Sequence, residues 1–114
     1  MTMDVLFAGV PVREFTSSLE WYTRLFGRPA DVVAHEHEVM WRVTDAGWLY
    51  IVHEPERAGR SLVAISVRNL EAAVADIDGR GLHCGPILPE GDAGRKSTIS
   101  DPDGNLIALI EVRA

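Results

Sequence analysis

The sequence has a single cysteine, Cys84, so no disulfide can form within its 114 residues, as expected of a protein in a reducing compartment. It has no apolar run near the roughly 20 residues that a membrane-spanning helix requires, and no basic segment followed by a long apolar stretch at its start. Lysine and arginine form no cluster, and a net charge of −6 disfavours nucleic acid and anionic membranes as partners. These absences predict a cytoplasmic protein that binds neither nucleic acid nor membrane.

Motifs for common catalytic chemistry are missing as well. No Ser-His-Asp or Cys-His arrangement has a suitable spacing, and GDAG at residues 91–94 lacks the Lys-Ser/Thr that completes a phosphate-binding loop. No catalytic residue is therefore assigned. An apolar content of 46% and a charged content of 25% are typical of a globular protein, and the length predicts one domain over residues 1–114.

The chain consists of two similar halves. LVAISV at residues 62–67 aligns with FAGVPV at residues 7–12, an offset of 55 residues. Three apolar helix positions repeat at the same offset, with Phe15, Leu19 and Tyr22 matched by Leu70, Val74 and Ile77. The repeat predicts two modules, about 1–58 and 59–114. One helix per module covers one face of a sheet, so the other faces must meet each other or a ligand.

Each half has the pattern of a βαβββ unit. In the first, strands are expected over residues 5–12, 39–43 and 48–54, with a short extra strand at 30–33. The helix between them should begin between Glu14 and Ser17, with Thr16 or Ser17 as its N-cap, and end at Gly27.

The second half repeats this order. Asn69 is expected to cap its helix, and strands are expected over residues 95–100 and 106–112. The last two strands flank DPDGN, which suits a tight turn closed by Gly104 with a positive φ angle.

Three segments resemble the vicinal oxygen chelate superfamily, which contains glyoxalases, bleomycin resistance proteins and extradiol dioxygenases. They read GVPVREFTSSLEWYTRLFG, ISVRNLEAAVADIDGRG and SDPDGNLIALIE, and the likeness covers nearly the whole chain. The resemblance implies an α+β fold of two tandem βαβββ modules. Their sheets form a curled mixed sheet around a central cleft, with one main helix per module on the outer face. It also implies a homodimer, because the family commonly pairs its modules across subunits.

Enzymes of the superfamily bind a divalent cation in the cleft through His, Glu or Gln. Carried over to this chain, the ligand positions fall on Phe7, Ile51, Leu62 and Ala108, the last from the pattern DPDGN-x-x-E. None of these side chains has a donor atom for a metal ion. We therefore expect no metal and no cofactor, and Ala108 should face the cleft where an enzyme of the family has its carboxylate.

A cleft without a metal is predicted to hold a small apolar or aromatic ligand. Strand alternation from Ile51 adds His53 to its lining, and the repeat offset adds Trp41 beside Thr98. The same alternation assigns Trp48 and Tyr50 to the core under the first helix, and Glu111 to the face opposite Ala108. The complete predicted set of ligand-binding residues is Phe7, Trp41, Ile51, His53, Leu62, Thr98 and Ala108.

Three functions fit these patterns. The leading one is metal-free binding of a small molecule, similar in kind to the bleomycin resistance proteins. The second is an enzyme, either glyoxalase- or dioxygenase-like with unusual metal ligands such as His53, or a metal-free isomerase or hydrolase. The third is a dimerising accessory domain whose own side chains fill the cleft. His35 and His37 can point to one side of an extended segment, but the charged neighbours Glu36 and Glu38 favour a solvated connection.

Overall fold

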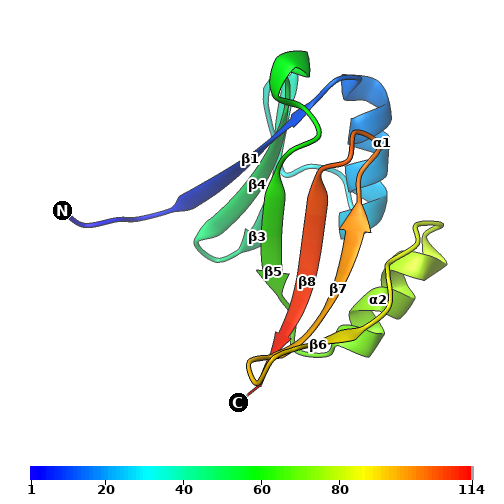
Figure 1. Ribbon diagram of the computed structural model, residues 1–114. Coiled ribbons are helices and arrows are strands. Elements are labelled where there is room, and N and C mark those ends of the chain that lie inside the picture. The colour runs from blue at the N-terminus through cyan, green and yellow to red at the C-terminus, as the bar shows by residue number, and fades with distance from the viewer. Residues whose placement is uncertain (114) are drawn as a thin grey trace.

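The computed structural model describes residues 1–113 and contains two four-stranded sheets (Figure 1). Their strand orders are β1-β4-β3-β2 and β5-β8-β7-β6. In each sheet the first strand of the module runs parallel to the last, and the remaining neighbours are antiparallel. The prediction of two βαβββ modules is confirmed. Ala114, the end of the second predicted module, lies outside the described residues.

The first module contains five regular elements and a short 3-10 helix, η1. They are β1 (Leu6–Val12), α1 (Phe15–Phe26), β2 (Val32–His35), β3 (Glu38–Thr44), β4 (Gly47–His53) and η1 (Pro55–Arg57). Helix α1 ends at Gly27 as expected, with a φ angle of 72°. The predicted N-cap was wrong. Glu14 occupies that position without a side-chain cap, and the Ser17 hydroxyl donates to the Glu14 carbonyl oxygen, because the helix begins early enough to bring Phe15 against the core.

The second module repeats the order. It contains β5 (Leu62–Ser66), α2 (Leu70–Gly79), β6 (Leu88–Glu90), β7 (Gly94–Ser100) and β8 (Leu106–Val112). The expected cap of α2 is confirmed, since the Asn69 side chain accepts a hydrogen bond of 3.0 Å from the Ala72 N–H. Strand β6 was not predicted, because it lies in a segment rich in proline and glycine. Over residues 1–113, neither helix has the length and apolar character needed to cross a membrane.

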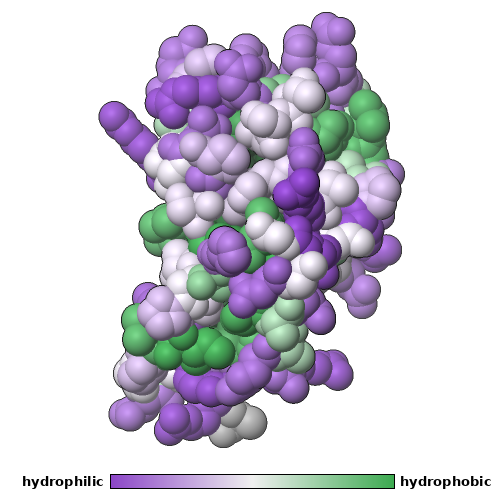
Figure 2. Space-filling model, turned by 90° about the vertical axis from the view of Figure 1, so that its right-hand side faces the viewer, coloured by the Kyte–Doolittle hydropathy of each residue, from purple (hydrophilic) through white to green (hydrophobic). Residues whose placement is uncertain are grey.

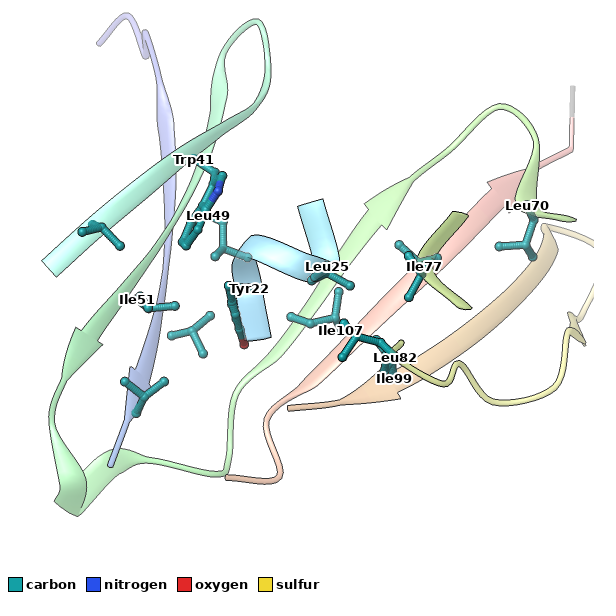
Figure 3. Packing of buried hydrophobic residues seen from close by; sticks show 14 residues of the cluster. Tyr22, Leu25, Trp41, Leu49, Ile51, Leu70, Ile77, Leu82, Ile99 and Ile107 are labelled. Atoms are coloured by element: carbon teal, nitrogen blue, oxygen red, sulfur yellow. The ribbon is translucent and has the colours of Figure 1, made fainter. Parts of the chain in front are cut away.

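Both modules contribute to one hydrophobic core. Its buried side chains come from both sheets and both helices, and α1 lies between the two sheets with Tyr22 and Leu25 directed into the cluster (Figure 3). Each sheet therefore turns its helix side towards the shared core. The opposite faces, which we call the helix-free faces, point away from it.

The DPDGN turn ties the two modules together. Asn105 is fully buried, and its Oδ1 accepts from the N–H groups of Gly59 and Ser61 at 3.0 and 2.9 Å. Its Nδ2 donates to the Pro11 carbonyl oxygen and to the Asp101 carboxylate, both at 2.9 Å. The turn thus holds the end of β1 and the segment between the modules in addition to joining β7 to β8.

Candidate functional site

Aromatic side chains gather on the helix-free face of the first sheet. Phe7 pairs with Trp48 across β1 and β4, and their rings stack with centroids 6.2 Å apart and planes inclined by 28°. Tyr50 lies two residues beyond Trp48 and therefore on the same face. Side chains from the alternate positions, such as Leu49 and Ile51, are buried on the helix side. We call Phe7, Trp48 and Tyr50 the aromatic platform.

Gly9 allows the platform to be continuous. It pairs with Tyr50 across the two strands, and a Cβ atom at Gly9 would lie 2.5 Å from Cζ and Oη of the Tyr50 ring. The ring therefore rests directly on the β1 backbone, in space that any other residue would fill. Phe7 keeps 51% of its surface exposed, so part of the platform is open to a partner molecule.

The helix-free face of the second sheet is aliphatic. Ala108 pairs with Ala64 on one side and with Thr98 on the other. Leu62 and Leu106 flank this row and are 70% and 40% exposed. Phe7, Leu62, Thr98 and Ala108 thus all lie on helix-free faces, where the sequence placed them, and their role in binding stays a prediction.

Trp41 and Ile51 do not lie on a helix-free face, and the prediction that they line a cleft was wrong. Both are completely buried on the helix side. The Trp41 ring lies 6.2 Å from that of Tyr22 and 5.4 Å from that of Phe26, and its Nε1–H donates to the Arg28 carbonyl oxygen at 3.0 Å. Trp41 is thus a core residue under α1.

A one-residue shift in the repeat explains these errors. Gly9 and Ala64 are equivalent, and their strand partners are Tyr50 and Ala108, which are 58 residues apart. The predicted offset for this strand was 57, which selected Ile51. Because side chains alternate along a strand, one residue of shift exchanges the two faces. It also moved Trp48 and Tyr50, the main aromatic residues of the site, into the predicted core.

His53 also lies away from the helix-free face. It stands at the end of β4, near the start of α1, with its ring centroid 5.6 Å from that of His37. Glu111, by contrast, lies on the other face of the sheet from Ala108, as alternation indicated. Its Oε2 accepts from the Leu70 N–H at the start of α2, a contact on the helix side of the sheet at 2.9 Å.

The helix-free faces do not fit the divalent ion that the resemblance implies. With the shift corrected, the family's ligand positions are Phe7, Tyr50, Leu62 and Ala108, which offer one phenol and neither imidazole nor carboxylate. Metal sites of this kind need imidazole or carboxylate donors. Within residues 1–113, no three His, Cys, Asp or Glu side chains converge on a point that could hold a metal ion.

An apolar hollow borders the platform. It has a volume of about 210 Å³ and lies between the first strands of the two modules. Trp48, Ala64 and Ser66 line it, but much of its wall comes from side chains on the helix side of the sheets, such as Leu49, Val63 and Ile65. The surface that carries α1 and α2 is different, since hydrophilic residues predominate there and apolar residues form separate patches (Figure 2). The aromatic platform, with the hollow that meets it at Trp48, is therefore the best candidate for a ligand site.

Known proteins resemble this chain in sequence and in fold. The profile of the Glyoxalase/Bleomycin resistance protein/Dioxygenase superfamily matches residues 5–109. A solved glyoxalase/bleomycin resistance protein from Catenulispora acidiphila DSM 44928 is 36% identical, with a TM-score of 0.91 over 97% of this chain and 100% of that chain. No curated protein matches the sequence.

Two more distant structures share the fold. A bleomycin-binding protein complexed with bleomycin is 18% identical, with a TM-score of 0.76 over 99% of this chain and 100% of that chain. An antibiotic-binding protein from Streptomyces sp. CB03234 is 21% identical, with a TM-score of 0.77 over 98% of each chain. At these identities the likeness is one of fold alone.

Proposed function

The chain belongs to the glyoxalase/bleomycin resistance protein/dioxygenase superfamily, and we propose that it binds a planar aromatic small molecule without using a metal ion. The observation that carries this proposal is the aromatic platform of Phe7, Trp48 and Tyr50 on a sheet face that no helix covers. Two proteins of the same fold are a bleomycin-binding protein and an antibiotic-binding protein, which supports binding as the role of the scaffold.

The chemistry of the platform favours a flat ligand. Aromatic rings stack in offset arrangements and gain about 0.5–1.5 kcal/mol per pair beyond the burial of their area. Tyr50, whose ring contacts Gly9, adds a hydroxyl that can donate or accept one hydrogen bond at the edge of the platform. The platform itself contains no imidazole, carboxylate or thiol for proton transfer or nucleophilic attack, so we propose binding and no reaction.

A second copy of the chain supplies the wall of the ligand site that faces the aromatic platform. The hollow beside Trp48, at about 210 Å³, is smaller than the roughly 300–1,000 Å³ typical of ligand pockets. Within one chain the helix-free faces point away from the shared core, so they cannot enclose a ligand between them. We propose a two-fold homodimer in which the platform of one copy faces Ala64 and Ala108 of the other.

Calorimetric titration of the intact protein with bleomycin and with a planar anthracycline tests this function. The expected result is saturable binding of at least one of them, weakened about tenfold or more by Trp48→Leu, because the stacking surface is removed. Trp21→Leu is the matched control, since Trp21 lies on α1, away from the platform. Equal affinities for wild type and Trp48→Leu would contradict the proposed site, and no binding of any aromatic probe would contradict the function.

A further inference from the structure

A polar hollow lies at the N-terminal end of α1, apart from the aromatic platform. Its volume is about 280 Å³. His37 and His53 both line it, with ring centroids 5.6 Å apart and planes inclined by 44°. His37 comes from the turn between β2 and β3, and His53 from the end of β4. Two imidazoles from separate parts of the chain therefore meet beside one hollow.

The backbone keeps the two histidines together. The His53 N–H donates to the His37 carbonyl oxygen at 3.1 Å, which continues the pairing of β3 with β4 into the turn. Phe15, the first residue of α1, contacts the His37 ring edge-on with centroids 5.9 Å apart. Strand pairing and the contact with the helix thus hold the two rings near each other.

We propose that His37 and His53 chelate a divalent transition-metal ion in this hollow. An imidazole nitrogen binds such an ion at about 2.0–2.1 Å, which places the ring centroid about 3 Å from the ion. Two rings on one ion then have centroids no more than about 6 Å apart, a limit that the observed 5.6 Å satisfies. No third His, Cys, Asp or Glu within residues 1–113 joins them in a metal-binding group, so water completes the coordination shell.

The surrounding groups suit a cation. Glu14 and Glu36 line the hollow, and Oε1 of Glu36 lies 3.9 Å from Nδ1 of His37. At this distance there is no hydrogen bond, and the Glu36 carboxylate contributes negative charge beside the imidazole. The one lining residue that opposes a cation is Arg13, and it is engaged elsewhere. Its guanidinium lies 3.5 Å from the Asp103 carboxylate and donates to the Ala58 carbonyl oxygen.

His35 is close in sequence but is already engaged. Its Nδ1 accepts the His37 N–H at 3.2 Å, and its Nε2 lies 3.7 Å from Oε1 of Glu38. It is therefore a control for the site and no part of it. Among first-row ions, neutral imidazole ligands favour Cu²⁺ most strongly, followed by Ni²⁺ and Zn²⁺. With two protein ligands we expect Cu²⁺ to bind with a dissociation constant in the micromolar range.

The experiment is a calorimetric titration of the chelator-treated full chain with Cu²⁺, together with electron paramagnetic resonance of the loaded protein. The expected result is one site per chain whose spectrum reports two coordinated imidazoles. His37→Asn and His53→Asn should each weaken binding by tenfold or more. His35→Asn and His83→Asn should retain the wild-type affinity, and circular dichroism should confirm that all four variants are folded.

Two results would overturn the site. One is a loss of binding in His35→Asn or His83→Asn that equals the loss in His53→Asn, since the copper would then be held by scattered surface imidazoles. The other is a spectrum with a single imidazole in the wild-type protein. If His37→Asn proves unstable, the spectrum of His53→Asn decides the question by itself. One coordinated imidazole in that variant supports the site, and a spectrum like that of the wild type overturns it.

Discussion

The Tyr22 hydroxyl donates a 2.8 Å hydrogen bond to Oδ2 of Asp101, and this contact joins the helix of the first module to the DPDGN turn of the second. Both residues are buried, at 0% and 4% exposure. Burial, reinforced by the Asp101 charge, raises the pKa of the Tyr22 phenol far above its usual range, so the phenol remains a hydrogen-bond donor throughout the pH range of the folded protein. Oδ1 of Asp101 accepts the N–H groups of Asp103 and Asn105, which shapes the turn itself.

Replacing Tyr22 by Phe should lower the free energy of unfolding by about 1.5–3 kcal/mol, the range for hydrogen bonds to charged groups. The ring still fills the core, so the loss reflects the hydroxyl alone. Urea unfolding at neutral pH measures it. Tyr50→Phe is the matched control, because that hydroxyl lies on the helix-free face, and it should be nearly neutral. An equal, small effect of both changes would mean that the Tyr22–Asp101 bond adds nothing to the joining of the modules.

The architecture could be predicted from the sequence because its signals are local and repeated. The capping of α2 by Asn69, the end of α1 at Gly27 and the positive φ of 97° at Gly104 each follow from one residue type at one position. The two-module plan follows from a repeat that spans a strand and a helix. Such signals survive small errors in alignment, since an amphipathic helix or a turn is still recognised when its bounds move by a residue.

The composition of the site could not be predicted to the same degree. The face on which a strand residue lies depends on register, and the segment from the turn glycine to the equivalent strand position is one residue longer in the second module, from Gly104 to Ala108, than in the first, from Gly47 to Tyr50. The alignment of Gly47 with Gly104 hid this difference and exchanged Tyr50 with Ile51. A signal was available in the sequence, since Gly9 in an apolar strand often marks the close approach of another group. His37 and His53 meet through tertiary pairing, which no local pattern reveals.

Gly9→Ala should remove the Tyr50 ring from its place in the platform. The added Cβ would stand 2.5 Å from Cζ and Oη of Tyr50, and the ring can yield only by rotating away. Because Tyr50 is half-buried on a surface, the free energy of unfolding should change by less than about 1 kcal/mol. Affinity for the aromatic ligand, measured by calorimetry, should fall to that of Tyr50→Ala, and the double variant should bind no worse. Additive losses would show that Gly9 and Tyr50 act separately.

Acid stability should depend on Arg95. Its guanidinium donates two hydrogen bonds of 2.7 and 2.8 Å to Glu71 and one of 2.8 Å to Glu111. The bonds from Arg95 lower the pKa of Glu71 from 4.5 to about 2. The Leu70 N–H, followed by Arg95, lowers the pKa of Glu111. The pKa values of both carboxyl groups are lower in the folded than in the unfolded chain. The unfolded chain therefore binds more protons between about pH 4.5 and pH 2.

The stabilisation from these carboxylates is therefore complete above about pH 4.5 and is lost as the pH falls towards 2. Urea unfolding at pH 6, 4 and 3 should show that the free energy of unfolding of the wild type falls with pH, and that it falls less steeply in Arg95→Met. Arg95→Lys keeps the charge but not the forked geometry, so its slope should lie between the two. Parallel declines for all three proteins would show that other groups determine acid stability. High salt should reduce the differences, because the pairs are exposed.

The proposed homodimer should appear as a particle of about 25 kDa in light scattering, since the chain has a mass of 12.5 kDa. Leu62→Glu should shift it towards the monomer, because it places a charge on the helix-free face of the second sheet. Val33→Glu is the control. Val33 is also 70% exposed, but it pairs with the core residue Val39 and so lies on the helix side of its sheet. A monomeric wild type at micromolar concentration would contradict the dimer.

Ala108→Trp separates an open ligand site from a filled one. Ala108 lies on the helix-free face between Ala64 and Thr98, where the family's enzymes have a carboxylate. If this face is a wall of the ligand site, the indole occupies the space of the ligand, so binding is lost while the melting temperature stays near that of wild type. If side chains of the partner copy fill the space, the indole overpacks it and costs about 1–3 kcal/mol, a drop of several degrees in the melting temperature of a domain of this size.

Leu109→Trp, at the adjacent position on the core side, shows the size of the drop that overpacking causes in this strand. We expect Ala108→Trp to melt well above Leu109→Trp and to bind no aromatic ligand.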